Sequence, residues 1–174
     1  TATADNASKL NYATKVNTLI GTDYTGNTYP GAQAPFGMVQ LSPDNGLPGW
    51  DRIAGYFYPD STIAGFSHTH LSGTGAGDLY DISFLPVTLP LNDAPAPLGI
   101  HSKFSHDDET AHAGYYQVRL TDYDINVELT ATPRCGGQRY TFPNKGRQRM
   151  VILNLTKAMN WDATKDTKIT QIDK

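Results

Sequence analysis

The most regular alternation of hydrophobic and polar residues lies in the second half of the chain. Every second residue is hydrophobic in Tyr116–Leu120, and the same alternation returns in Ile125–Leu129. The segment Thr121–Asp124 between them has the composition of a turn. Because alternate residues of a strand point to opposite faces, the two runs predict an antiparallel hairpin with one buried face.

Shorter hydrophobic runs, separated by segments rich in glycine and proline, predict further strands. They are Met38–Leu41, Thr62–Phe66, Ile82–Val87, Gln138–Phe142 and Met150–Leu155. Many short strands with frequent turn signals and little helix are typical of two packed antiparallel sheets. The sequence therefore predicts an all-β protein with the architecture of an antiparallel β-sandwich.

One short helix is predicted near the start of the chain, over Ser8–Ile20. Hydrophobic residues recur there at helical spacing, Ser8 is a suitable N-cap, and Gly21 is a suitable helix end. At the other end, the sequence from Thr156 to Lys174 is polar and predicts no closing strand. We therefore expect residues 1–174 to form one β-sandwich domain, or a fragment of a longer one.

Composition narrows the classes of partner. The net charge is −3 with both signs scattered along the chain, so a nucleic acid partner is not expected. No hydrophobic run approaches the roughly 18 residues of a membrane-spanning helix. Cys135 is the single cysteine of the sequence, which excludes a disulfide within the chain and a cysteine metal cluster.

The residues of greatest chemical interest gather in Gly49–Asp81, which combines glycines, aromatic residues, histidines and acids. Glycine lets the backbone turn sharply and lets a ligand approach it closely. Trp50 and Asp51 follow Gly49 directly. An indole can cover the apolar face of a sugar ring while a carboxylate accepts hydrogen bonds from its hydroxyls. These residues indicate a sugar-binding loop, and the alternative is a set of surface loops with ordinary turn chemistry.

His68 and His70 are two residues apart, a spacing that would place both imidazoles on one face of a strand. The spacing allows metal ligation with Asp78 and Asp81 as further ligands, although no third histidine lies nearby. The same imidazoles could instead donate hydrogen bonds to sugar hydroxyls, or serve as hydrogen-bonding groups within the fold. The sequence leaves these three roles open.

Several acids in the first half suggest a pair of catalytic carboxylates, as in glycoside hydrolysis. Asp44 lies in the turn-like sequence SPDNG and Asp60 lies in PDS, so both are interpreted as turn residues. Asp51 is the acid favoured for ligand contact, because Trp50 adjoins it and a glycine precedes both.

Longer motifs carry a specific resemblance. They are VNTLIGT, NTYPGAQAPFGMVQLSPD, GWD, GYFYPDSTIAGFSHTHLSGTGAGD, GYYQVRL, ELTATPR and RYTFP. Between about Val16 and Phe142 the chain is similar to the N-terminal domain of glycoside hydrolase family 92, a family of bacterial exo-acting α-mannosidases. The resemblance implies a β-sandwich followed by a helical (α/α)6 barrel, with the active site between the two.

The resemblance also implies which residues contact the substrate. The matching residues belong to the GWD, PFG and SHTHLSGTG motifs and are Gly49, Trp50 and Asp51, then Phe36 and Gly37, then His68 and His70. This chain has GTGAGDLYD where the family commonly has GTGCSDYGD, which leaves the specificity for the glycosidic linkage open.

Catalysis is implied to lie outside this chain. In the family, the general acid, the general base and the calcium ligands come mainly from the barrel, and the glycosidic bond is cleaved with inversion. No segment here resembles that barrel. The resemblance therefore implies the substrate-recognising domain of a calcium-dependent exo-α-mannosidase, of the α-1,2 type, that binds mannose-containing glycans and packs against its own barrel. The isolated chain is expected to be inactive.

Two alternatives remain at this point. A free-standing carbohydrate-binding module would explain the short chain and the missing barrel, and a metal-binding structural domain would depend on His68 and His70 alone. The family implies a periplasmic, secreted or cell-surface bacterial protein, although the polar start TATADNASK shows no signal peptide.

Overall fold

The computed structural model describes residues 11–73, 79–90, 100–144, 147–155 and 164–173. Within these ranges the protein is all-β, as the sequence predicts. The strands are β1 (Ala32–Gln33), β2 (Gln40–Asp44), β3 (Thr62–Ile63), β4 (Gly65–Ser67), β5 (Ser83–Leu89), β6 (Ser102–Lys103), β7 (Glu109–His112), β8 (Tyr115–Leu120), β9 (Ile125–Ala131), β10 (Gly136–Thr141) and β11 (Gln148–Asn154). Three short 3-10 helices join them, namely η1 (Tyr12–Lys15), η2 (Trp50–Arg52) and η3 (His106–Asp108).

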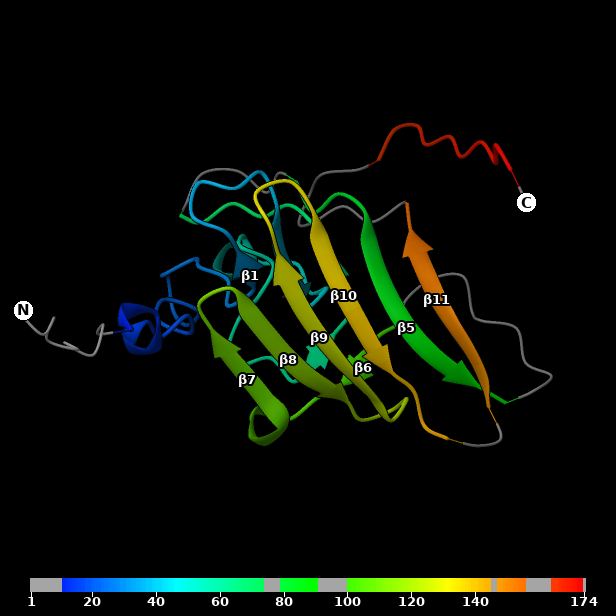
Figure 1. The fold of residues 1–174 in the computed structure, drawn as a ribbon, viewed down its shortest axis with the longest axis horizontal. Helices are drawn as coiled ribbons and strands as arrows, with labels where there is room; N and C mark the ends of the chain where they lie inside the picture. Colours follow the sequence, from blue (N-terminus) through cyan, green and yellow to red (C-terminus); the bar gives the residue numbers. More distant parts are fainter. Residues whose placement is uncertain (1–10, 74–78, 91–99, 145–146, 156–163, 174) are drawn as a thin grey trace, which may run out of the picture.

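Two antiparallel sheets form the layers of a sandwich (Figure 1). One sheet has the strand order β1-β2-β4-β5-β11, the other has the order β10-β9-β8-β7, and β3 and β6 form a separate short pair. The sheets face each other through β1 and β2, which both contact β9. The predicted β-sandwich is therefore confirmed.

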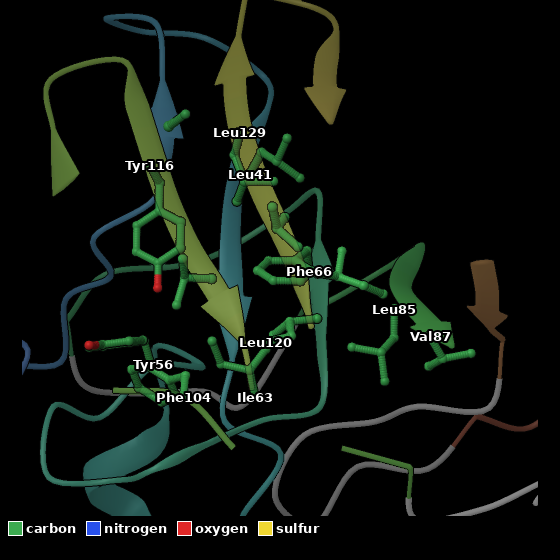
Figure 2. Close-up of a cluster of buried hydrophobic side chains, with 14 residues drawn as sticks. Leu41, Tyr56, Ile63, Phe66, Leu85, Val87, Phe104, Tyr116, Leu120 and Leu129 are labelled. Atoms are coloured by element: carbon green, nitrogen blue, oxygen red, sulfur yellow. The ribbon is translucent and has the colours of Figure 1, made fainter. Parts of the chain in front are cut away.

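Hydrophobic side chains from both sheets meet between the layers (Figure 2). The predicted hairpin is β8 with β9, and its buried residues alternate with more exposed ones, as at the directly opposed pair Val118 and Val127. Leu41 of β2 and Phe66 of β4 come from the facing sheet and are fully buried. Removal of this apolar surface from water holds the two sheets together.

Most other predicted strands are present with shifted ends, as β2, β5, β10 and β11. The predicted strand Thr62–Phe66 is divided into β3 and β4. Ala64 lies between these strands, and its amide N–H donates to the carbonyl oxygen of Asp44 at 2.8 Å. Consequently β3 pairs with β6, whereas β4 joins the larger sheet.

The predicted helix over Ser8–Ile20 is wrong for the part of it that the structure describes. Tyr12–Lys15 forms one 3-10 turn, and Val16 after it is extended. The side chains of Asn11 and Asn17 accept hydrogen bonds from amides two residues further on, which satisfies the backbone locally in place of helical bonds. β-Branched residues in the segment also lower its helix propensity. Residues 8–10 lie outside the described ranges.

β10 and β11 each lie at one end of their sheet. Inward-facing residues of β11, such as Met150, are only partly buried against the core. On its other face Val151 and Leu153 are 46% and 38% exposed. The described chain thus exposes apolar surface along this edge.

Candidate functional site

The Gly49–Trp50–Asp51 motif lies in a surface turn that includes η2. The amide N–H of Arg52 donates to the carbonyl oxygen of Gly49 at 3.1 Å and so closes the turn. A side chain at position 49 would place its Cβ 2.6 Å from Asp51 Oδ1, so glycine leaves room for that carboxylate. Trp50 is 52% exposed. The turn therefore presents an indole beside a carboxylate, as the sequence predicts for sugar contact.

Arg52, which sequence reasoning did not select, fixes this turn. Its Nε and Nη2 donate to the two carboxylate oxygens of Asp60 at 2.7 and 2.6 Å, and its Nη1 donates to Asp51 Oδ1 at 2.9 Å. The guanidinium also lies 4.5 Å from the ring centroid of Phe57. Hydrogen bonding to Asp60 raises the pKa of Arg52. Because a bidentate pair restricts the guanidinium to one orientation, Asp51 is held next to Trp50.

The interpretation of Asp60 and Asp44 as turn residues was incomplete. The amide N–H of Asp60 does close a turn, to the carbonyl oxygen of Phe57 at 3.0 Å, but the Asp60 carboxylate is also the nearly buried partner of Arg52. Asp44 ends β2 and is fully buried. Both acids are therefore part of the packed interior beneath the exposed turn.

His70 lies beneath the surface and is 2% exposed. Its Nδ1 lies 2.7 Å from the carbonyl oxygen of Gln40, and its Nε2 lies 2.8 Å from Asp44 Oδ1 and 3.1 Å from Ser67 Oγ. Both ring nitrogens thus have partners within the chain. Of the three roles that the sequence left open, these contacts favour hydrogen bonding within the fold.

Gly55 connects His70 and its neighbours to the exposed turn. Its φ is +87°, and an added Cβ would lie 2.7 Å from Tyr80 Cε1 and 2.8 Å from Asp44 Oδ1. Tyr80 packs edge-on against His70, with ring centroids 5.3 Å apart. Burial, and then the charge of Asp44, raises the pKa of Tyr80. The Trp50 turn therefore lies on a tightly packed polar layer that requires glycine at position 55.

His68 has a different environment from His70. Its Nδ1 lies 3.0 Å from the carbonyl oxygen of Ile82, and its ring packs edge-on against Phe84 with centroids 5.6 Å apart. The strand that was expected to align the two imidazoles, β4, already ends at Ser67. No group of three histidine, cysteine or acidic residues that could hold a metal ion occurs among the described residues, and Asp78 lies outside them.

Phe36 and Gly37 form a separate exposed turn. The amide N–H of Gly37 donates to the carbonyl oxygen of Ala34 at 2.9 Å. Phe36 is fully exposed at the left-handed φ of 57°. An added Cβ at Gly37 would lie 3.3 Å from the Cα of Pro133, so this turn borders the connection between β9 and β10.

The predicted site residues consequently fall into two groups. Gly136, at the start of β10, packs against the ring of His68, since its added Cβ would lie 2.7 Å from His68 Cδ2. His68 and the Phe36 turn therefore both border residues 133–136. The Trp50 turn instead lies with Asp60 and His70.

A buried cluster that sequence reasoning missed contacts the chain at Tyr56 and Tyr58, shortly after the Trp50 turn; we call it the Glu109 cluster. The Glu109 side chain is 2% exposed and accepts hydrogen bonds from the hydroxyls of Tyr56 at 2.9 Å and Tyr116 at 2.6 Å. His106 Nδ1 lies 2.6 Å from Glu109 Oε2, and its Nε2 lies 2.8 Å from the carbonyl oxygen of Tyr58. Burial, and then the charge of Glu109, raises the pKa of Tyr56 and of Tyr116.

The exposed indole of Trp50 and the carboxylate of Asp51 on one turn are groups suited to contact with carbohydrate. The sequence profile of the Glycosyl hydrolase family 92 N-terminal domain matches residues 15–174. The chain therefore belongs to this family of N-terminal domains, and the family resemblance seen in the sequence is confirmed.

Solved structures with the same fold include family members. The family GH92 alpha-mannosidase BT3965 from Bacteroides thetaiotaomicron, solved in complex with mannoimidazole, is 40% identical with a TM-score of 0.77 over 85% of this chain and 20% of its own. The GH92 family glycosyl hydrolase ccman5 is 32% identical with a TM-score of 0.71, over 84% of this chain and 21% of its own.

A fungal relative is also similar. An uncharacterized secreted glycosidase of Arthroderma benhamiae is 28% identical over 156 residues, which are 81% of this chain and 19% of that protein. The chain thus spans about a fifth of the length of these relatives. Within the part that the structure describes, no helix has the length and hydrophobicity that crossing a membrane requires.

Proposed function

We propose that this chain is the substrate-recognising N-terminal part of an exo-acting α-mannosidase of the α-1,2 type, and that Trp50 and Asp51 contact the mannoside. The observation that carries the proposal is a surface turn that contains an exposed indole, Trp50, followed by a carboxylate, Asp51, that Arg52 holds, in a chain that belongs to glycoside hydrolase family 92. The indole covers the apolar face of a pyranose, and the carboxylate accepts hydrogen bonds from its hydroxyls. Phe36, Gly37 and His68 would form a second contact region.

The catalytic carboxyl groups belong, in this proposal, to the remainder of the protein. Inversion needs two carboxyl groups about 6.5–9.5 Å apart with a water molecule between them. The buried acids Asp44, Asp60 and Glu109 are engaged with His70, Arg52 and His106. These pairings support a recognition role for the chain, with the acid and the base on a C-terminal barrel.

Calcium is proposed as a cofactor of the complete protein. Calcium takes about six to eight oxygen ligands. The described residues contain no group of three histidines, cysteines or acids that could hold a metal ion, so they do not fit such a site and no step is assigned to the ion here. Export to the periplasm, the cell surface or the medium of a bacterium completes the proposal, and the secreted relative supports the export.

The test is the kinetics of the complete protein on an α-mannoside. Asp51→Asn removes a charge-assisted hydrogen bond, so kcat/KM should fall about ten- to a hundredfold. Trp50→Ala removes the apolar contact and should raise KM more than it lowers kcat. The matched control is Asp124→Asn, because Asp124 is an exposed acid that pairs with Arg119 at 2.7 Å in the turn between β8 and β9. It should leave both constants unchanged.

Wild-type kcat/KM for folded Trp50→Ala and Asp51→Asn variants would contradict the assignment of these two residues. A complete protein that binds mannose-containing glycans without cleaving them would favour the free-standing carbohydrate-binding module instead.

A further inference from the structure

With Glu109 ionised, His106 makes both of its hydrogen bonds in its doubly protonated form. Its Nδ1 faces a carboxylate oxygen of Glu109, and its Nε2 faces the carbonyl oxygen of Tyr58. Carbonyl and carboxylate oxygens accept and cannot donate, so each bond needs its own proton on the ring. Glu109 already accepts two tyrosine hydroxyls, which is the role of an ionised carboxylate. A neutral imidazole would therefore lose one of the two bonds.

These two bonds attach the Glu109 cluster to the Tyr56–Asp60 segment, which follows the Trp50 turn along the chain. The ring of Tyr58 stacks on that of His106 with centroids 4.0 Å apart and an interplanar angle of 9°. Tyr56, two residues before Tyr58, donates to Glu109, so the loop is held at both residues. His106 and Glu109 thus set the position of the backbone at Tyr58.

From Tyr58 a short series of contacts leads to the exposed turn. Asp60 follows two residues later and is the bidentate partner of Arg52. Arg52 in turn donates to Asp51. The position of the Asp51 carboxylate is therefore linked, through Asp60 and Arg52, to the backbone that His106 holds.

We propose that His106 is a positioning residue, whose second proton holds the Tyr56–Asp60 segment and thereby the Trp50 turn in the conformation that contacts the ligand. When His106 loses that proton as the pH rises, one of its two bonds is lost and the turn loosens. The proposal depends on the proposed function only for the nature of the ligand.

The groups around His106 come from four elements. They are Glu109 of β7, Tyr116 of β8, Tyr56 and Tyr58 of the loop, and Asp107 and Asp108 of η3. Among these six groups the acids carry negative charge and the phenols are neutral, so no positive charge among them competes with a protonated ring.

Fluorescence of Trp50 tests the proposal in the 174-residue chain. The sequence has two tryptophans, so a Trp161→Phe background leaves Trp50 as the only tryptophan, which is excited selectively over the ten tyrosines at the red edge of the absorption band. Acrylamide quenching of Trp50 should increase as the pH is raised from about 5 to 9, across the range where histidine titrates. The increase should disappear in a His106→Gln variant, which remains quenchable at all pH values.

The matched control is His112→Gln. His112 lies on β7, is exposed, and stacks on Tyr115 of β8 with ring centroids 4.9 Å apart. Its variant should keep the wild-type pH profile. In His106→Gln, hydrogen exchange of the Tyr58 and Asp60 amides should accelerate about ten- to a hundredfold, because a bond from a charged donor is lost, while the β8–β9 ladder stays protected.

If His106→Gln does not fold, nitrogen-15 spectra of the wild-type imidazoles supply the decisive measurement. They should show protons on both ring nitrogens of His106 at pH 5 and on one at pH 9. A Trp50 quenching profile that is flat in the wild type, or unchanged in folded His106→Gln, would overturn the proposal. Neither result involves mannoside turnover, so the proposed function and this inference fail independently.

Discussion

Arg52 gives two neighbouring carboxylates different roles. The Asp60 side chain is 7% exposed and occupies two N–H groups of the guanidinium, whereas the Asp51 side chain is 40% exposed and receives one. A bidentate pair fixes geometry, while an exposed carboxylate with a single protein donor keeps lone pairs available for a ligand. Asp51 is therefore the acid that we propose for substrate contact, and Asp60 orients the guanidinium of Arg52.

Gly55→Ala should destabilise the chain more than the same change at another left-handed glycine. The left-handed conformation costs alanine about 1–2 kcal/mol, and crowding against Asp44 and Tyr80 should add roughly 1–3 kcal/mol. Gly114→Ala is the control, because Gly114 has a φ of +78° and nothing within 4 Å of an added Cβ. Urea unfolding of both variants measures the difference. Equal losses would show that Asp44 and Tyr80 do not crowd position 55.

Single residues were predictable from the sequence where their environment is local. Trp50 and Asp51 are neighbours in the chain, so their juxtaposition follows from the motif itself. The partners of Glu109 and Arg52 were not predictable, because Tyr56 is 53 residues from Glu109 and Asp60 is eight residues from Arg52. His70 was predicted to contact the substrate, with hydrogen bonding within the fold as one alternative, and its burial depends on Tyr80 and Gly55, which the fold brings together.

At the scale of elements, periodicity succeeded where a strand has one buried face. β8 and β9 alternate strictly, and their hairpin was predicted with nearly correct ends. The short strands β1, β3 and β6 have two residues each, too few for any period to be visible. The predicted helix failed because hydrophobic spacing alone does not outweigh local asparagine capping and β-branched residues.

The exposed apolar face of β11 should make the isolated chain self-associate. Val151→Lys combined with Leu153→Lys removes two apolar side chains and adds charge along an edge strand, which should weaken association roughly tenfold or more. Ile172→Lys is the control, because Ile172 is 89% exposed and lies outside the sheets. Sedimentation at several concentrations measures the effect. A monomeric wild-type chain would contradict the expectation and favour an autonomous module.

At the scale of the whole molecule, a packed β-sandwich carries the exposed Trp50 turn on its surface. The two sheets provide the core. The polar residues around His70 pack against Gly55, which follows the turn. The Glu109 cluster bonds to the chain at Tyr56 and Tyr58. The buried acids Asp44, Asp60 and Glu109 are already paired within the chain, and the match covers only 20% of the BT3965 chain. These features agree with a recognition domain whose chemistry is completed by the remainder of the protein.

The most direct test of this account compares the 174-residue chain with the complete protein on an aryl α-mannoside. Both are purified, shown to be folded, and assayed with calcium present. We expect turnover by the complete protein and, for the isolated chain, release of the aryl group at the rate of the buffer alone. Turnover by the isolated chain that is abolished by Asp51→Asn would contradict it, because catalysis would then reside in this domain.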